Sequence, residues 1–131
     1  IMPNILEELK GVIEGNGLTM DNIKCADMWK FIDYGDEDNN YQENVVPFII
    51  YTYDDVKPAL YDEERAATIA DMGKHTYDSG YGGQELFGCV WMDNGEYITR
   101  GEYDGSEWWD YHRVPEVPNK LKLDKAGNPL E

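Results

Sequence analysis

The sequence predicts an α+β fold, in which an antiparallel meander sheet of about five strands carries the N-terminal helix on one face. Three observations support this prediction. Apolar residues near the start of the chain recur at helical spacing, aromatic and polar residues alternate between tight turns in its second half, and 131 residues are enough for one core. We expect residues 1–118 to form a single acidic α+β domain and residues 119–131 to form a flexible C-terminal tail.

Residues 3–14 are predicted to form the N-terminal helix, because their apolar residues share one stripe at spacings of one, three and four. Gly15-Asn16-Gly17 then provides a stop signal. We expect the stripe to pack on the sheet, and an amphipathic helix that binds a partner is the alternative. The stripe consists of Ile5, Leu6, Leu9, Val12 and Ile13.

The middle of the chain is predicted to contain strands and a short helix. Residues 23–34 fit both strand and helix periods, and we favour a strand. Residues 45–53 are the most apolar run, where Pro47 indicates an edge or a bulge, and residues 56–61 are expected to return as a partner strand. Residues 62–72 resemble a short helix with acids in its first turn, near the second face of the sheet. Its inward residues are expected to be Ala66, Ile69 and Met72.

Residues 85–114 are predicted to form a three-stranded meander, because Asn94-Gly95 and Asp104-Gly105 lie between aromatic and β-branched runs. The apolar run at residues 86–92 predicts a central strand buried on both faces. The next strand alternates, and we expect its charged face to be exposed to solvent. That face carries Glu96, Arg100, Glu102 and Asp104, and the other carries Tyr97, Thr99 and Tyr103. Trp108 and Trp109 should point to opposite faces.

The sequence contains no catalytic motif, so we predict a protein that is not an enzyme and holds no cofactor or metal. His75 and His112 have no motif neighbours, and Asp36, Glu37 and Asp38 lack the spacing of a calcium loop. Cys25 and Cys89 are expected to be buried free thiols, and a single disulfide is the alternative. The absence of a long apolar run or an N-terminal signal pattern predicts a cytoplasmic protein without a membrane partner.

Charge is the most unusual property of the chain. It carries 27 acids and 11 bases, for a net charge of -16. Residues 33–110 hold 19 acids and 4 bases, whereas residues 111–131 are net positive by one. A field of this sign disfavours direct contact with nucleic acid or anionic membranes and favours a basic protein surface.

These carboxylates predict a surface that imitates nucleic acid, and acidity that serves solubility alone is the alternative. Alternate residues on a strand stand about 6.6 Å apart, similar to successive phosphates, and Glu102 and Asp104 have this spacing. Aromatic residues at the rim would anchor the complex. The candidate partner-binding residues are Asp36, Glu37, Asp38, Asp54, Asp55, Asp62, Glu63, Glu64, Glu96, Glu102, Tyr103, Asp104 and Trp108, with Tyr111 as a further aromatic anchor.

Residues 87–118 contain the Asn-Gly turn, the segment GEYDGSEWW and a closing Pro-Glu-Val-Pro. This run resembles short uncharacterised proteins of bacteriophages and prophages that end in a Trp-containing strand followed by a Pro-x-Pro tail. The resemblance implies a setting in which small acidic proteins inhibit host restriction and CRISPR systems. The expected function is therefore a DNA mimic that blocks the basic surface of a nucleic-acid-binding host defence protein, in the host bacterial cytoplasm. The alternatives are an interaction module that binds through exposed aromatic residues, and a small hydrolase, which would require an enclosed pocket with converging carboxylates. A homodimer is left open.

Overall fold

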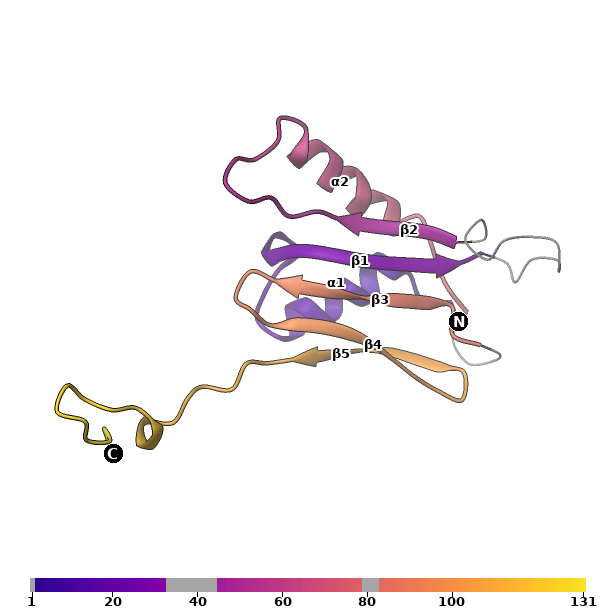
Figure 1. Ribbon diagram of the computed structural model, residues 1–131. Helices are drawn as coiled ribbons and strands as arrows, with labels where there is room; N and C mark the ends of the chain where they lie inside the picture. Colours follow the sequence, from indigo (N-terminus) through magenta and orange to yellow (C-terminus); the bar gives the residue numbers. More distant parts are fainter. Residues whose placement is uncertain (1, 33–44, 79–82) are drawn as a thin grey trace.

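The computed structural model describes residues 2–32, 45–78 and 83–131. It confirms the α+β prediction, because two helices accompany one antiparallel sheet with the strand order β2-β1-β3-β4-β5 (Figure 1). Helix α1 lies behind the sheet in this view, and the near face carries no helix. None of the helices in the described ranges is long and apolar enough to cross a membrane.

Helix α1 spans Ile5–Gly15 and packs its predicted stripe on the sheet. It begins where the Asn4 side chain accepts a hydrogen bond from Glu7 N at 3.1 Å, and it ends at the expected glycine stop. Ile5, Leu9 and Ile13 are completely buried. On the opposite side of the helix, Glu7 and Glu14 are exposed, as expected for an amphipathic helix. Glu8 is half-buried and pairs with Arg100.

Strands β1 (Ile23–Phe31), β2 (Val45–Ile50) and β3 (Leu86–Met92) form one half of the sheet. The strand interpretation of the ambiguous residues 23–34 is confirmed for Ile23–Phe31. β2 is an edge strand, which explains why Pro47 is tolerated there without a backbone donor. A register shift between Ile23 and Cys25 marks an irregularity at the start of β1.

Strands β4 (Tyr97–Tyr103) and β5 (Ser106–His112) complete the predicted meander. Asp104 and Gly105 form the two-residue turn between them, with φ of 52° and 86°. Positive φ at both positions is the type I′ geometry that matches the twist of a hairpin. As predicted, Trp108 and Trp109 point to opposite faces of the sheet, and Trp109 is 7% exposed whereas Trp108 is 40% exposed.

Helix α2 spans Tyr61–Met72 and corrects three expectations. Residues 56–60 form no strand, since the chain runs through bends and an exposed turn before α2 begins. The helix does not cover the second face of the sheet: it lies beside β2 and contributes Met72 to the core that α1 also builds (Figure 1). Ala66 is exposed rather than inward. Only Ile69 and Met72 of the three inward candidates reach the core, which is too little apolar surface to cover a sheet face.

The core lies between α1 and one face of the sheet, which we call the core face. Successive strands supply its fully buried side chains, among them Met28, Phe48, Val90 and Ile98. Two further expectations are wrong here. β3 is buried on one face only, because Trp91 is 42% exposed on the other. In β4, Arg100 is not in solvent, because it shares the side of buried Ile98 and its side chain is only 2% exposed, whereas Glu102 and Asp104 are exposed as expected.

After β5, residues 113–131 leave the body of the molecule as an extended segment, the C-terminal arm (Figure 1). The arm contains a short 3-10 turn at Asn119–Leu121 and a closed turn in which Leu123 pairs with Pro129. The last strand of the sheet therefore ends at His112, and the domain boundary expected at residue 118 stays a prediction.

Candidate functional site

The face of the sheet opposite α1, which we call the open face, is the most distinctive surface of the described chain. The strand registers place alternate residues of all five strands on it. No helix in the described ranges packs against it (Figure 1). It is built from Cys25, Asp27, Trp29, Phe31, Val45, Pro47, Ile49, Phe87, Cys89, Trp91, Tyr97, Thr99, Gly101, Tyr103, Ser106, Trp108, Asp110 and His112.

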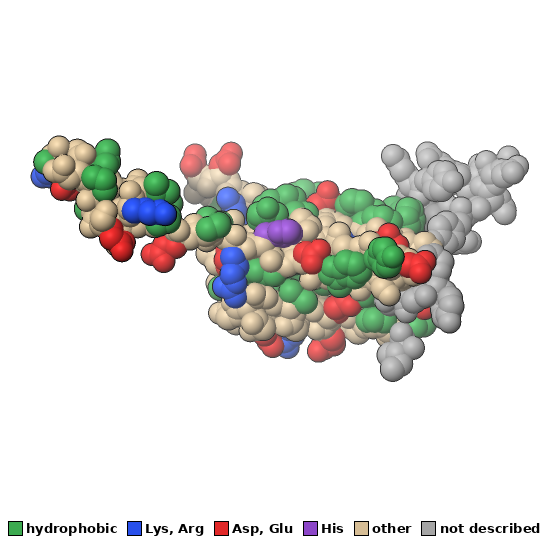
Figure 2. All heavy atoms as spheres, turned by 90° about the horizontal axis from the view of Figure 1, so that it is seen from below, with side chains coloured by type: hydrophobic (Ala, Val, Ile, Leu, Met, Phe, Trp, Pro, Cys, Tyr) green, Lys and Arg blue, Asp and Glu red, His purple; other side chains and the backbone are tan. Residues whose placement is uncertain are grey.

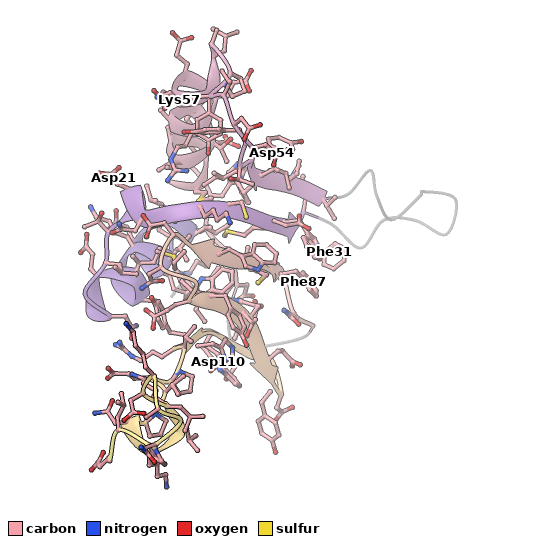
Figure 3. The ribbon with its side chains drawn as sticks, turned by 60° about the vertical axis from the view of Figure 1, so that its left-hand side comes forward. Asp21, Phe31, Asp54, Lys57, Phe87 and Asp110 are labelled. Carbon is pink, nitrogen blue, oxygen red and sulfur yellow. The ribbon has the colours of Figure 1, made fainter. Side chains whose placement is uncertain are left out.

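Aromatic rings on the open face hold one another in place. Trp29 and Phe87 stack with centroids 5.7 Å apart, and Phe31 meets Phe87 edge-on at 5.1 Å. Figure 3 shows Phe31 and Phe87 side by side on adjacent strands. Tyr97 stacks on His112 at 4.6 Å. Such pairs stabilise a surface that would otherwise be unfavourable, and they keep it rigid before any partner binds.

The open face is nevertheless exposed over much of its area. Trp91 is 42% exposed, Tyr97 and Trp108 are each 40% exposed, and Tyr103 is 77% exposed. Exposed aromatic residues that gather on one face of a sheet make that face a candidate site of interaction.

A depression of about 350 Å³ lies between β1, β3 and β4 on this face. The aromatic side chains of Trp29, Phe87 and Trp91 line it together with the shorter Cys89 and Thr99. Asp27 is a further lining residue, and it stands opposite Cys89 in the register. Gln84 and Arg100 also line the depression, but the Arg100 side chain is only 2% exposed and pairs with Glu8 and Glu107 on the core face. The depression therefore combines apolar walls with the exposed carboxylate of Asp27.

The charge of the open face has one sign. Its carboxylates are Asp27 and Asp110, and the residues that define it include no lysine or arginine. Asp110 accepts a hydrogen bond from Trp108 Nε1 at 3.0 Å, which fixes the orientation of that indole. A cationic group that approached this face would meet carboxylates and ring faces together.

The core face under β4 and β5 contains a buried ionic cluster, the Arg100 cluster, which sequence analysis missed. Arg100 lies 2.7 Å from Glu8 of α1 and 3.1 Å from Glu107 of β5. Its guanidinium lies over the rings of Tyr77 and Trp109, 4.8 Å from each centroid. Glu107 also accepts hydrogen bonds from the backbone N–H groups of Glu85 and Leu86, at 2.8 and 3.1 Å.

The cluster shifts two pKa values. Burial of Arg100 works against its charge, but contacts with Tyr77 and Glu8 more than offset this and raise its pKa. Burial, followed by the hydrogen bond to Glu8, raises the pKa of Tyr77 to about 12. The cluster joins α1 to β5 and to the segment that leads into β3, so we assign it a structural role.

Five of the predicted partner-binding residues meet at one corner of the molecule, which we call the acidic corner. The loop after β2 supplies two of them and the first turn of α2 the other three. Basic side chains lie among them, since Lys57 pairs with Asp62 at 2.9 Å and Arg65 follows one residue after Glu64. The acidic corner consists of Asp54, Asp55, Asp62, Glu63 and Glu64.

The remaining predicted residues lie elsewhere. Figure 3 places Asp54 beyond one edge of the sheet and Asp110 at the other, and the β4–β5 turn with Glu102, Tyr103 and Asp104 belongs to this second edge. The fold therefore does not bring all the predicted carboxylates into one continuous ribbon. On the side seen in Figure 2, acidic side chains are scattered among hydrophobic and basic ones.

The individual environments of these residues differ as well. Glu102 accepts a hydrogen bond from Gly105 N at 3.1 Å, and Asp104 occupies a turn rather than a strand, so the strand spacing assumed for this pair does not apply. Glu96 accepts hydrogen bonds from Tyr111 and Asn94, which lower its pKa. Tyr103 and Trp108 lie on the open face. Asp36, Glu37 and Asp38 fall outside the described residues.

Sequence analysis identified only part of the open face. It selected Trp108 and Tyr103 but not Trp29, Phe87 or Trp91. A signal was present, because Trp29 and Phe31 in one strand, and Phe87 and Trp91 in the other, stand an even number of residues apart and so share a face of their strand. Alternation shows that these residues share a face, but it cannot show that no helix covers them.

Comparison with known proteins adds no candidate site. A scan against protein-family models matched none, and searches of curated proteins and of solved structures returned no match. Within the described ranges, no group of three or more His, Cys, Asp or Glu side chains is arranged to hold a metal ion. The geometry of the open face is therefore the strongest basis for a functional proposal.

Proposed function

We propose that this chain is a non-enzymatic binding protein whose open face docks a segment of a partner protein that carries basic and aliphatic side chains. The exposure of Trp91, Tyr97 and Trp108 on a sheet face that no described element covers supports this proposal most strongly. Aromatic residues dominate the energetics of protein interfaces because they bury a large area with few rotatable bonds.

The depression on the open face suggests which side chains the partner contributes. Its aromatic walls suit the methylene groups of a lysine or arginine, and Asp27 suits the cationic end. The net charge of -16 would accelerate the approach of such a partner from a distance. Binding through this face should depend mainly on the aromatic rings and only moderately on salt.

Affinity capture from a bacterial lysate at low and high salt tests the proposal. The Trp91→Ala chain should lose the partner at both salt concentrations, because it removes a wall of the depression. Tyr53→Ala is a matched control for the open face: Tyr53 is also 42% exposed, but it lies in the loop after β2, beside the acidic corner, so a loss of capture by Tyr53→Ala would point to that corner instead. Equal capture by wild type and Trp91→Ala would reject the open face as the docking surface.

A second candidate is the nucleic-acid mimic, in which a phage- or prophage-encoded inhibitor of the anti-CRISPR or anti-restriction type occupies the basic channel of a host defence protein. Its support is the acidic corner, where five carboxylates meet beside exposed Tyr51 and Tyr53. Glu102 and Asp104 lie at the other edge of the sheet, so the surface that would imitate nucleic acid is confined to one end of the molecule.

Salt and charge reversal separate the two candidates. A mimic should release its partner at high salt and should lose it when Asp55 and Glu63 are changed to lysine. Glu116→Lys, in the C-terminal arm, is the control for a general change of charge. If capture tolerates the Asp55→Lys, Glu63→Lys double variant but not Trp91→Ala, the open face is the functional site and the mimic proposal fails.

A further inference from the structure

The C-terminal arm exposes apolar side chains that its own chain does not cover. Every residue from 113 to 131 is exposed. Five of them are large aliphatic residues with more than half of their surface in solvent: Val114 at 61%, Val117 at 54%, Leu121 at 68%, Leu123 at 66% and Leu130 at 55%. Aliphatic residues at this density are unfavourable in solvent and indicate a surface that is covered in the functional state.

The arm has local order despite this exposure. Leu121 N donates to Pro118 O at 2.9 Å, and Leu130 N donates to Lys122 O at 2.9 Å. The Asp124 carboxylate accepts hydrogen bonds from the backbone of Ala126 and Asn128, both at 2.9 Å. The arm is therefore shaped before it binds, which lowers the entropic cost of docking.

The arm is also chemically complementary to the open face. Residues 120–123 alternate lysine and leucine, and residues 113–131 hold four bases and three acids in a chain that is otherwise strongly acidic. The open face offers aromatic walls and the carboxylates of Asp27 and Asp110. Figure 2 shows hydrophobic and basic side chains together on the projecting arm.

The root of the arm directs it away from its own sheet. Arg113 donates to Asn16 Oδ1 at 2.9 Å, and its guanidinium lies 5.7 Å from the ring centroid of Tyr111. Pro115 and Pro118 stiffen the segment that follows. The arm continues beyond the end of β5 (Figure 1), so it would have to reverse direction to reach the open face of its own chain.

We propose that the C-terminal arm of a second copy docks on the open face, with Leu121 and Leu123 against the aromatic rings and Lys120 and Lys122 near the carboxylates. Two copies related by a two-fold axis would exchange arms, and this arrangement closes because each copy supplies one arm and one face. The inference rests on the proposed function, because it uses the same face. It adds regulation: a foreign basic segment must displace the arm, so the dimer is the resting state.

Mixing two full-length variants tests this exchange. The arm variant carries Leu121→Asp and Leu123→Asp, and the face variant carries Trp91→Ala. Each alone should dimerise at least about tenfold more weakly than wild type in sedimentation equilibrium, because both of its contacts are damaged. An equimolar mixture retains one intact contact, between the arm of the face variant and the face of the arm variant. Native mass spectrometry should therefore detect the heterodimer well above the twofold excess over either homodimer that random pairing alone would give.

Matched controls keep the result interpretable. Val56→Asp places the same charge on an aliphatic residue that is 80% exposed in the loop before α2, and Tyr53→Ala removes an equally exposed ring. Both should dimerise as wild type does. Far-UV circular dichroism establishes that the arm and face variants are folded.

Three results would overturn the inference. In the first, the wild-type chain remains monomeric at about 100 μM, which is above the dissociation constant of most specific dimers. In the second, the arm and face variants dimerise as wild type does. In the third, the mixture of the two variants forms no heterodimer. Failure here is separable from failure of the proposed function. If the wild-type chain is monomeric but Trp91→Ala still loses its captured partner, only the exchange is wrong. If the exchange is observed and no partner depends on Trp91, only the proposed function is wrong.

Discussion

Trp108 and Trp109 are neighbours in sequence, and the sheet places them in opposite environments. Trp109 is 7% exposed on the core face, where it covers Arg100, whereas Trp108 is 40% exposed on the open face over Gly101. The same contrast extends across the sheet. The core face is covered by α1 and holds a buried ion cluster, and the open face carries stacked rings that no described element covers. Similar residues therefore serve stability on one side and are available for recognition on the other.

The two faces should respond differently to mutation, because close packing makes the core face sensitive to small changes. On the open face, side chains can move into solvent at low cost. The predictions below test this difference, starting with the largest effect.

Arg100→Leu should produce the largest loss of stability, about 3–5 kcal/mol, because it leaves Glu107 buried without its cation. Chemical denaturation followed by fluorescence measures this loss. Arg113→Leu is the control, since Arg113 is an exposed arginine whose removal should change stability by about 0.5 kcal/mol or less. A loss below about 1 kcal/mol for Arg100→Leu would contradict the structural role of the cluster.

Alanine substitution of one glycine on each face compares the two faces directly. At Gly88, with φ of 139°, a Cβ would lie 2.3 Å from Asp27 O and 2.7 Å from Met28 Cα, so we expect Gly88→Ala to cost at least about 2 kcal/mol. At Gly101, a Cβ would lie 2.5 Å from Trp108 Nε1, a side chain that can rotate outward. Gly101→Ala should cost about 1 kcal/mol or less and should shift the tryptophan fluorescence. Similar losses for both variants would remove the distinction between the faces.

Alkaline pH should weaken the core face through Tyr77. Burial and the hydrogen bond to Glu8 raise its pKa to about 12, above the value of about 10 in an unfolded chain. The contribution to stability is therefore complete below about pH 10 and is lost as the pH rises from about 10 to about 12. Denaturation at a series of pH values should show this fall, and Tyr77→Phe should flatten it. An unchanged profile in Tyr77→Phe would assign the fall to other groups.

The smallest expected effect is a change in thiol reactivity on the open face. Burial, followed by the neighbouring Cys25 thiol, raises the pKa of Cys89. Iodoacetamide should therefore modify Cys89 slowly near neutral pH and faster as the pH rises, which peptide mass spectrometry can follow. A segment docked on the open face should slow the modification further. Cys25 and Cys89 are free thiols, as expected, but they are half-buried rather than buried. Rapid modification at neutral pH would contradict the raised pKa of Cys89.

Much of the fold could be predicted from local patterns. The stripe of α1 and its stop at Gly15, the strand at residues 45–50, and the hairpin turns at Gly95 and Gly105 are all encoded within a few residues. The failures were long-range. The expected strand at residues 56–61 had suitable residues but no partner, and Arg100 was expected in solvent because alternation shows which residues share a face without showing which face is covered.

For the candidate site, the sequence alone determined the inventory: the acidic balance, the aromatic residues at alternate strand positions, and a C-terminal segment richer in bases than the rest. Tertiary structure decided their arrangement. Because α1 has one apolar stripe and α2 contributes little more than Ile69 and Met72, the helices cover a single face and leave Trp29, Phe87 and Trp91 together on the other. The acids, in contrast, are distributed by strand order over opposite edges of the sheet. The spacing of apolar residues and the residues of a turn depend on a few neighbouring positions, so the sequence shows them directly. Which face of a sheet is covered depends on contacts between segments far apart in the chain.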